Sequence, residues 1–221
     1  HTAVFGQLRD EFDLNLQQLG LIASIPSLAS AVLAIPVGLL SDRIGPKKML
    51  LMSFGFAGLG AILAGTSSTP MMLIVAVCLI YINTAIYHPA SYSATAKMFK
   101  PEDRAKAMGL HGAGGTLGHA MGPLSVSLLV GLLAWQWRQV YLFLAAPMFI
   151  GILMVLKLPD DSEEKVEKKQ EKKATGEKFL TTSLLMFLAY QATRMIASSM
   201  MNTFLVLYLQ DVRGMSLTVS T

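Results

Sequence analysis

Long apolar stretches that carry almost no charge make up most of this 221-residue chain. A helix rises about 1.5 Å per residue, so about 20 apolar residues cross the hydrocarbon core of a bilayer. The chain is 53% hydrophobic and 14% charged, whereas soluble domains carry roughly 25% charged residues. The sequence therefore predicts an all-α, polytopic membrane protein. Its expected spans are residues 20–40, 49–66, 71–96, 106–134, 139–157 and 179–209.

Residues 1–19 lie before the first expected span and mix charged with apolar side chains. The apolar residues recur at helical spacing, for example at Phe5, Leu8 and Phe12. This segment is therefore predicted to be the end of a preceding helix followed by an external turn.

The cations are distributed unequally between the two sides of the membrane. Fourteen of the 18 Lys and Arg residues fall in residues 41–48, 97–106 and 157–178. The three in the loops on the opposite side are Arg9, Arg138 and Arg213. Loops that stay in the cytoplasm carry an excess of Lys and Arg. The cation-rich segments are therefore predicted to be cytoplasmic, in a multi-pass protein of the plasma membrane.

A dense run of acidic residues and lysines, at residues 158–178, interrupts the apolar pattern. Such a run cannot enter a bilayer or form a core, so it is predicted to be a charged cytoplasmic loop. It separates residues 1–157 from residues 179–221. A weak internal repeat pairs Leu8-Arg9-Asp10 with Leu209-Gln210-Asp211 at an offset of 201 residues. The repeat places the end of the chain at a point equivalent to its start, one six-helix period later.

The cytoplasmic turn between the first two spans combines small, acidic and basic residues. Gly38 permits close approach of helices, and Gly45 can adopt a backbone angle that other residues resist. Asp42 can accept hydrogen bonds from a helix N-terminus or pair with a cation. The basic residues are expected to anchor the turn on the anionic leaflet. They are Arg43, Lys47 and Lys48.

The spacing of these residues from Gly38 to Lys48 resembles the signature loop between helices 2 and 3 of the major facilitator superfamily. Pro46 stands where that family usually has a basic residue. The resemblance implies twelve helices in two halves, alternating access, and a substrate cavity between the halves. It further implies that Asp42 and Arg43 lock the halves together on the cytoplasmic side. This chain would then hold the N-terminal half and helix 7, with the remaining helices of the full-length chain as its partners.

A second stretch, within about residues 81–123, resembles the fosmidomycin-resistance branch of that superfamily. The matching residues are Tyr87-His88-Pro89-Ala90, Phe99, Pro101, Arg104 and Gly109-Leu110-His111-Gly112-Ala113-Gly114-Gly115. This resemblance implies a secondary active transporter that moves a small solute, with drug or organic-anion efflux as one expected activity. The residues from Gly118 to Pro123 resemble the core of the superfamily's helix-5 motif. Val126 and Ser127 replace the two glycines expected after that core.

Two expected spans carry polar residues along one face, at spacings of three and four residues. The first face holds Thr84, His88, Ser91 and Thr95, and the second holds Gln191, Arg194, Ser198 and Asn202. The resemblance places both helices beside the central cavity, where polar faces would bind substrate or couple transport. The alternative interpretation is polar contact between packed helices.

Arg194 and His88 are the most informative of these polar residues. A charge in the middle of a span is costly and usually faces the protein interior or water. Arg194 can therefore bind an anionic group of a substrate, or pair with a carboxylate elsewhere. His88 can titrate near neutral pH and carry protons, or serve as a hydrogen-bonded packing residue. His111 and His119 are predicted to be structural.

Gly114, Gly118 and Gly122 recur every four residues and are followed by Pro123. Small residues at this spacing allow close packing of membrane helices, which is the predicted role of this ridge. Packing that can slide also contributes to alternating access. Substitution of Gly118 by leucine is therefore expected to harm both assembly and transport.

Several functional classes are disfavoured by what the chain lacks. Cys78 is the single cysteine, which excludes an internal disulfide and a cysteine-rich metal site. No nucleophile–base set, paired carboxylates or metal-ligand spacing occurs, so neither an enzyme nor a bound metal or cofactor is expected. The net charge of +4 comes from loop cations and does not indicate nucleic-acid binding. The expected partners are a small-molecule substrate, the lipid bilayer and, as a candidate coupling ion, protons. A non-transporting receptor built on a transporter fold is the alternative.

Overall fold

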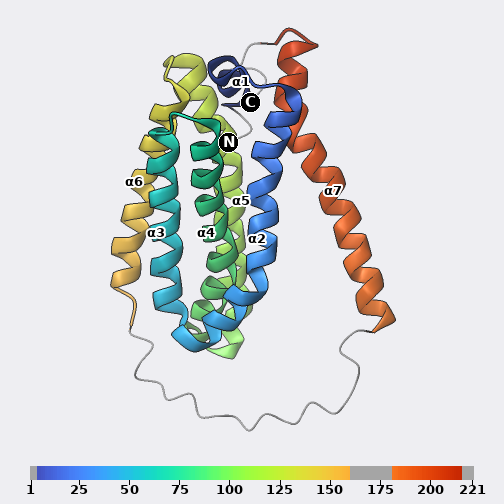
Figure 1. The fold of residues 1–221 in the computed structure, drawn as a ribbon. Helices are drawn as coiled ribbons and strands as arrows, with labels where there is room; N and C mark the ends of the chain where they lie inside the picture. The colour runs from blue at the N-terminus through green and yellow to red at the C-terminus, as the bar shows by residue number, and fades with distance from the viewer. Residues whose placement is uncertain (1–3, 160–180, 216–221) are drawn as a thin grey trace.

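The computed structural model describes residues 4–159 and 181–215, and within these ranges it contains only helices and the turns between them (Figure 1). The helices are α1 (Phe5–Phe12), α2 (Leu16–Ile44), α3 (Pro46–Gly65), α4 (Pro70–Met98), α5 (Pro101–Val126), the π-helical segment η2 (Ser127–Leu132), α6 (Trp137–Leu156) and α7 (Thr182–Asp211). The predicted all-α class is confirmed, and each predicted span overlaps one of α2 to α7. The charged loop predicted at residues 158–178 lies almost wholly outside the described residues.

Of the described helices, α2, α3, α4, α5 with η2, and α6 are long and apolar enough to cross a membrane. The sixth predicted span corresponds to α7, which is not among these five. Its 30 residues make it about 45 Å long, so length is not what distinguishes it. The polar residues on its face, Arg194 among them, lower its hydropathy.

Side-chain caps set where the long helices begin. The Asn15 side chain accepts the Gln18 N–H at 2.8 Å, and the Gln18 side chain accepts the Asn15 N–H at 2.9 Å. This reciprocal capping box starts α2 at Leu16, before the predicted start at residue 20. The hydroxyls of Thr69 and Thr181 cap α4 and α7 by accepting a backbone N–H three residues later.

A single residue, Gly45, joins α2 to α3. Its backbone angles are φ 89° and ψ 155°, a region open almost only to glycine. Pro46 occupies the first position of α3, where its missing N–H removes no helical hydrogen bond. Because Gly45 takes this backbone conformation and Pro46 begins the next helix, one residue is enough to reverse the direction of the chain between α2 and α3.

Helices α3 and α4 make the most extensive contact of the bundle; α3 also packs against α6, and α4 also packs against α2. Glycines make these contacts close. A β carbon on Gly60 would lie 2.8 Å from the carbonyl oxygen of Ala76, and one on Gly151 would lie 2.6 Å from the ring of Phe54. Gly65 is equally close to α6. The glycines that bring the described helices together are therefore on α3 and α6.

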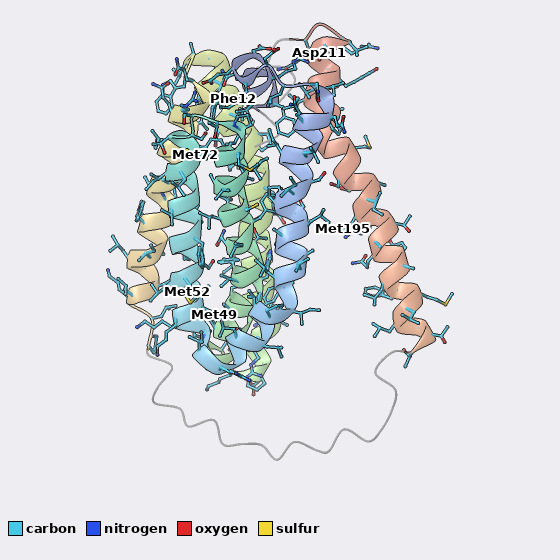
Figure 2. The ribbon with its side chains drawn as sticks, viewed as in Figure 1. Phe12, Met49, Met52, Met72, Met195 and Asp211 are labelled. Atoms are coloured by element: carbon cyan, nitrogen blue, oxygen red, sulfur yellow. The ribbon has the colours of Figure 1, made fainter. Side chains whose placement is uncertain are left out.

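Buried apolar residues form two clusters, one toward each end of the bundle. The first includes Phe5, Leu8 and Leu19, which are fully buried, together with Leu207 of α7. The second surrounds Met49 and draws on α2, α3, α4 and α6. We call the end that holds α1 and Asp211 the external end, and the end that holds Gly45 the cytoplasmic end, following the orientation predicted from the cations. Figure 2 labels Asp211 at the external end and Met49 toward the cytoplasmic end.

The last described helix, α7, meets the bundle at the external end and diverges from it toward the cytoplasmic end (Figure 1). Its contacts come from its final turns. Leu207 belongs to the first apolar cluster, and the Phe204 ring lies near Gly20 of α2. Met195, which Figure 2 labels about halfway along α7, stands apart from the bundle. The described helices thus form a bundle with one helix attached at one end.

Candidate functional site

The turn between α2 and α3 is tied to the end of α6. Lys47 Nζ donates to the carbonyl of Leu158 at 2.6 Å. Carbonyl groups beyond a helix C-terminus carry partial negative charge, which stabilises an ammonium group there. Arg43 and Lys48 are exposed, and the side chain of Asp42 lies outside what the structure describes. The sequence predicted a lipid contact for Lys47, and no local pattern relates it to a residue 111 positions away.

The polar face of α4 divides into two parts. Thr84 and His88 are exposed, whereas Ser91 is buried. The Ser91 hydroxyl donates to the His88 carbonyl at 3.1 Å and lies 3.4 Å from Nε2 of His111 on α5. Thr95 donates to the Ser91 carbonyl at 2.8 Å. The part of this face near Ser91 therefore contacts α5, whereas the part near His88 is not covered by other described residues.

Four rings of α4 and α5 gather beside Ser91, and we call them the tyrosine–histidine cluster: Tyr87, His88, Tyr92 and His111. The rings of Tyr87 and His111 stack with centroids 5.8 Å apart and planes at 26°. Tyr92 meets His111 edge-on at 5.7 Å. His111 is thus held between two tyrosines and a serine, and His88 lies at the open side of the same cluster. Both histidines were singled out from the sequence, His88 as a candidate residue and His111 as a structural one, but their contacts with the two tyrosines were not predicted.

A cavity of about 310 Å³ opens beside this cluster, between α3, α4, α5 and α6. Tyr87, Ser91, Thr95 and His111 form its polar side. Phe54 and other apolar residues of α3 and α6 form the rest. The cavity is therefore amphipathic, with its hydrogen-bonding groups on α4 and α5.

The polar face of α7 centres on Arg194, which is exposed. Its Nε donates to the Gln191 side-chain oxygen at 3.3 Å, and one terminal nitrogen lies 3.7 Å from the Met195 sulfur. The hydrogen bond that Arg194 donates to Gln191 fixes one edge of the guanidinium group and leaves the terminal nitrogens able to donate elsewhere. The side chain of Asn202 lies outside the described part, so its place on this face stays a prediction.

The glycine ridge of α5 faces open space within the described residues. A β carbon added to Gly114, Gly118 or Gly122 would meet no described heavy atom within 4 Å, and the same holds for Gly38. Pro123 lies inside α5, shortly before the helix changes to the π-helical segment. The close contacts predicted for these glycines are therefore not made with the part of the chain that the structure describes.

A charged and aromatic junction anchors α1 at the external end. Glu11 accepts a hydrogen bond from Trp137 Nε1 at 2.6 Å and pairs with Arg138. Arg138 also donates to the Ser67 carbonyl at 2.6 Å, and its guanidinium lies 4.4 Å from the centroid of the Trp137 ring. Burial raises the pKa of Glu11, but the hydrogen bonds from Arg138 and Trp137 and the charge of Arg138 outweigh it, so the pKa falls below its ordinary value.

Next to this junction, Arg9 of α1 forms a two-pronged ion pair with Asp211, the last residue of α7. The guanidinium–carboxylate distances are 2.5 and 3.2 Å. The hydrogen bond from Arg9, and secondarily its charge, hold the pKa of Asp211 below its ordinary value despite some burial, and the pKa of Arg9 is raised. Sequence reasoning paired these two segments only through the internal repeat and did not foresee the contact.

The described residues do not contain a group of three or more His, Cys, Asp or Glu side chains placed to hold a metal ion. The described candidate residues offer the hydroxyl groups of Thr84 and Ser91, the amide of Gln191, the imidazole of His88 and the guanidinium of Arg194.

Comparison with known proteins relates the chain to membrane transporters. Residues 2–221 match the Major Facilitator Superfamily. The probable nitrate transporter NarT of Staphylococcus epidermidis is 28% identical over 160 residues, which cover 72% of this chain and 40% of that protein. The fosmidomycin resistance protein of Escherichia coli K12 is 24% identical over 226 residues, which cover 97% of this chain and 53% of that protein. The chain spans about half, or less, of the length of these relatives.

A solved structure has the same arrangement of helices. It is the crystal structure of a bacterial homologue of the human lysosomal transporter Spinster, in an inward-facing and occupied conformation. Its TM-score is 0.83 at 20% sequence identity, and the match covers 99% of this chain and 51% of that one. This likeness concerns the fold. The chain therefore belongs to the Major Facilitator Superfamily, and its helices form part of that multi-pass membrane fold.

Proposed function

We propose that the full-length protein is a secondary active transporter that moves a small solute across the plasma membrane by alternating access. The observation that carries this proposal is the arrangement of α7, which meets the α1–α6 bundle at the external end and diverges from it toward the cytoplasmic end. Two bodies joined at one end can rock about that end and expose the space between them to one side. Membership of the superfamily supports this reading over an enzyme.

The proposed solute carries a negative charge, and Arg194 is its proposed binding group. Arg194 lies well inside α7 and is exposed, so its charge is not covered by other residues that the structure describes. The bond to Gln191 at 3.3 Å orients the guanidinium, whose terminal nitrogens match the geometry of a planar oxyanion. A relative named as a probable nitrate transporter supports an anionic solute.

The direction of transport is proposed to be outward, because a relative that covers 97% of the chain is named as a resistance protein. Asp42 and Arg43 are proposed to hold the two halves together at the cytoplasmic end when the external end opens. Thr84, His88 and Asn202 are proposed to line the space between the halves, and His88 to carry protons if coupling involves them. Ser91 is buried and is proposed instead to bind within the cavity beside the tyrosine–histidine cluster.

Solute flux in proteoliposomes tests the proposal. Full-length protein is reconstituted, loaded with nitrate or a small carboxylate, and assayed for counterflow. We expect flux with the parent protein, a loss of at least about tenfold in Arg194→Ala, corresponding to about 1.4 kcal/mol of binding, and partial recovery in Arg194→Lys. Arg213→Ala, at the external end, serves as the matched control. Normal flux in Arg194→Ala would refute the anion site, and binding without counterflow would favour the receptor alternative.

A further inference from the structure

The short helix α1 is fixed to the bundle along one side. Phe5 and Leu8 are fully buried in the first apolar cluster. Glu11, one turn further on, is held by Trp137 and Arg138 of α6. Helix α1 therefore moves with the bundle as one body, because apolar burial and a charged junction both attach it there.

Another residue of α1, Arg9, contacts α7. Arg9 binds Asp211 through two nitrogens, at 2.5 and 3.2 Å, and the two residues are 202 positions apart in sequence. Asp211 ends α7, the helix that diverges from the bundle elsewhere (Figure 1). Among the described residues, this ion pair joins the segments on either side of the charged loop.

Apolar and small residues seat the end of α7 beneath the ion pair. Leu207, one turn before Asp211, is only 3% exposed and belongs to the same cluster as Phe5 and Leu8. A β carbon on Gly6 would lie 3.3 Å from the side-chain oxygen of Gln210, so the absence of a side chain at Gly6 lets α7 come close. Leu207 is thus shielded from water, whereas the ion pair stays partly accessible: the exposed fraction is 32% for the Arg9 side chain and 42% for the Asp211 side chain.

We propose that Arg9 and Asp211 form a releasable latch that keeps the external end closed, with Leu207 as its apolar seat. This rests on the proposed function, because a latch has a role only if the two bodies rock. Water can replace the partners of an ion pair that is one-third exposed, whereas Leu207 must leave a buried cluster for the external end to open. Loss of either charge therefore shifts the protein toward the externally open state.

Labelling at Leu207 tests the latch without any solute. Full-length protein with Leu207→Cys, and with Cys78 and any further cysteine replaced by serine, is exposed to a membrane-impermeant maleimide from the external side. We expect Arg9→Gln and Asp211→Asn to raise the labelling rate about two- to fivefold, the scale of an exposed ion pair. The exchange Arg9→Asp with Asp211→Arg should restore the slow rate, and Arg213→Gln should leave it unchanged. Equal rates in all variants would overturn the latch.

A cross-link supplies the second arm. Gly6→Cys and Gln210→Cys, in the same background without other cysteines, are joined by a short methanethiosulfonate cross-linker that reductant removes. We expect the linked protein to stop counterflow and to recover when reduced. Undiminished counterflow in fully linked protein would overturn the latch. If the parent moves no solute at all, the proposed function fails, while the labelling rates still decide whether the external end is held by this pair.

Discussion

Gly60 of α3 lies so close to Ala76 of α4 that a β carbon on the glycine would sit 2.8 Å from the alanine carbonyl oxygen. That oxygen belongs to the backbone of a helix and cannot rotate away. Contact between α3 and α4 is extensive, so a side chain at position 60 would push apart two helices that pack along much of their length.

We expect Gly60→Ala to destabilise the full-length protein, because α3 and α4 must separate to admit the methyl group. Overpacking of this kind costs about 1–3 kcal/mol. Gly55→Ala is the matched control on the same helix, because a β carbon there meets nothing within 4 Å. Thermal unfolding of the purified protein in detergent measures both. An equal melting temperature for Gly60→Ala and the parent would contradict the close contact.

The glycine ridge of α5 should behave differently. Gly118 has open space beside it in the described residues, and we propose that a helix of the remaining chain packs there. Gly118→Leu should therefore lower both the yield of full-length protein and its counterflow, whereas Gly118→Ala should be tolerated, since small residues preserve close packing. Unchanged yield and flux in Gly118→Leu would show that the ridge faces lipid or water instead.

Acid should weaken the external end. The pKa values of Glu11 and Asp211 are lowered in the folded protein, so their ion pairs add stability above the ordinary carboxyl pKa and lose it as pH falls through the folded values. We expect the melting temperature to fall as pH drops below 4.5, the ordinary value for glutamate. Glu11→Gln should show a smaller fall, since it has no carboxylate to protonate. An identical pH profile in the two proteins would exclude this contribution.

His88 and His111 differ in their surroundings, so their roles can be tested separately. His88 is exposed at the open side of the tyrosine–histidine cluster, whereas His111 is held by Ser91, Tyr87 and Tyr92. If His88 carries the coupling protons, His88→Gln should abolish solute movement driven by a proton gradient but leave counterflow, which needs no such gradient, intact. His119→Gln, an exposed histidine on α5, is the control. Solute movement in His88→Gln that still follows the proton gradient would remove His88 from the coupling step.

The sequence predicted the helices better than their contacts. Membrane-length apolar stretches predict α2 to α6 because the bilayer constrains span length. Gly45 lies in the turn predicted between the first two spans, but the helices run to either side of it and leave no longer loop. The packing glycines Gly60 and Gly151 were missed, because their role depends on which helix lies opposite. The ridge at Gly114 to Gly122 has the expected spacing, yet none of the described residues packs against it.

Long-range polar contacts were the hardest to foresee. The bonds of Lys47 to Leu158 and of Arg9 to Asp211 join residues 111 and 202 positions apart, and nothing in the local composition selects such partners. The internal repeat that matched Leu8-Arg9-Asp10 with Leu209-Gln210-Asp211 gave the one hint. In the structure the two segments do meet, so equivalent ends of the repeat share an interface.

The hydrogen bond from Lys47 to Leu158 has a mechanical consequence. It fixes the point where the chain leaves α6, and the next described residue beyond the charged segment is Thr181. A fully extended chain covers roughly 3.3–3.6 Å per residue, so the tether between these two points could span roughly 80 Å. Covalent connectivity of that length does not by itself hold the cytoplasmic end of α7 beside the bundle. Within the described residues, α7 is held by noncovalent contacts at the external end, those of Asp211 with Arg9, of Leu207 with the first apolar cluster and of Phe204 with Gly20.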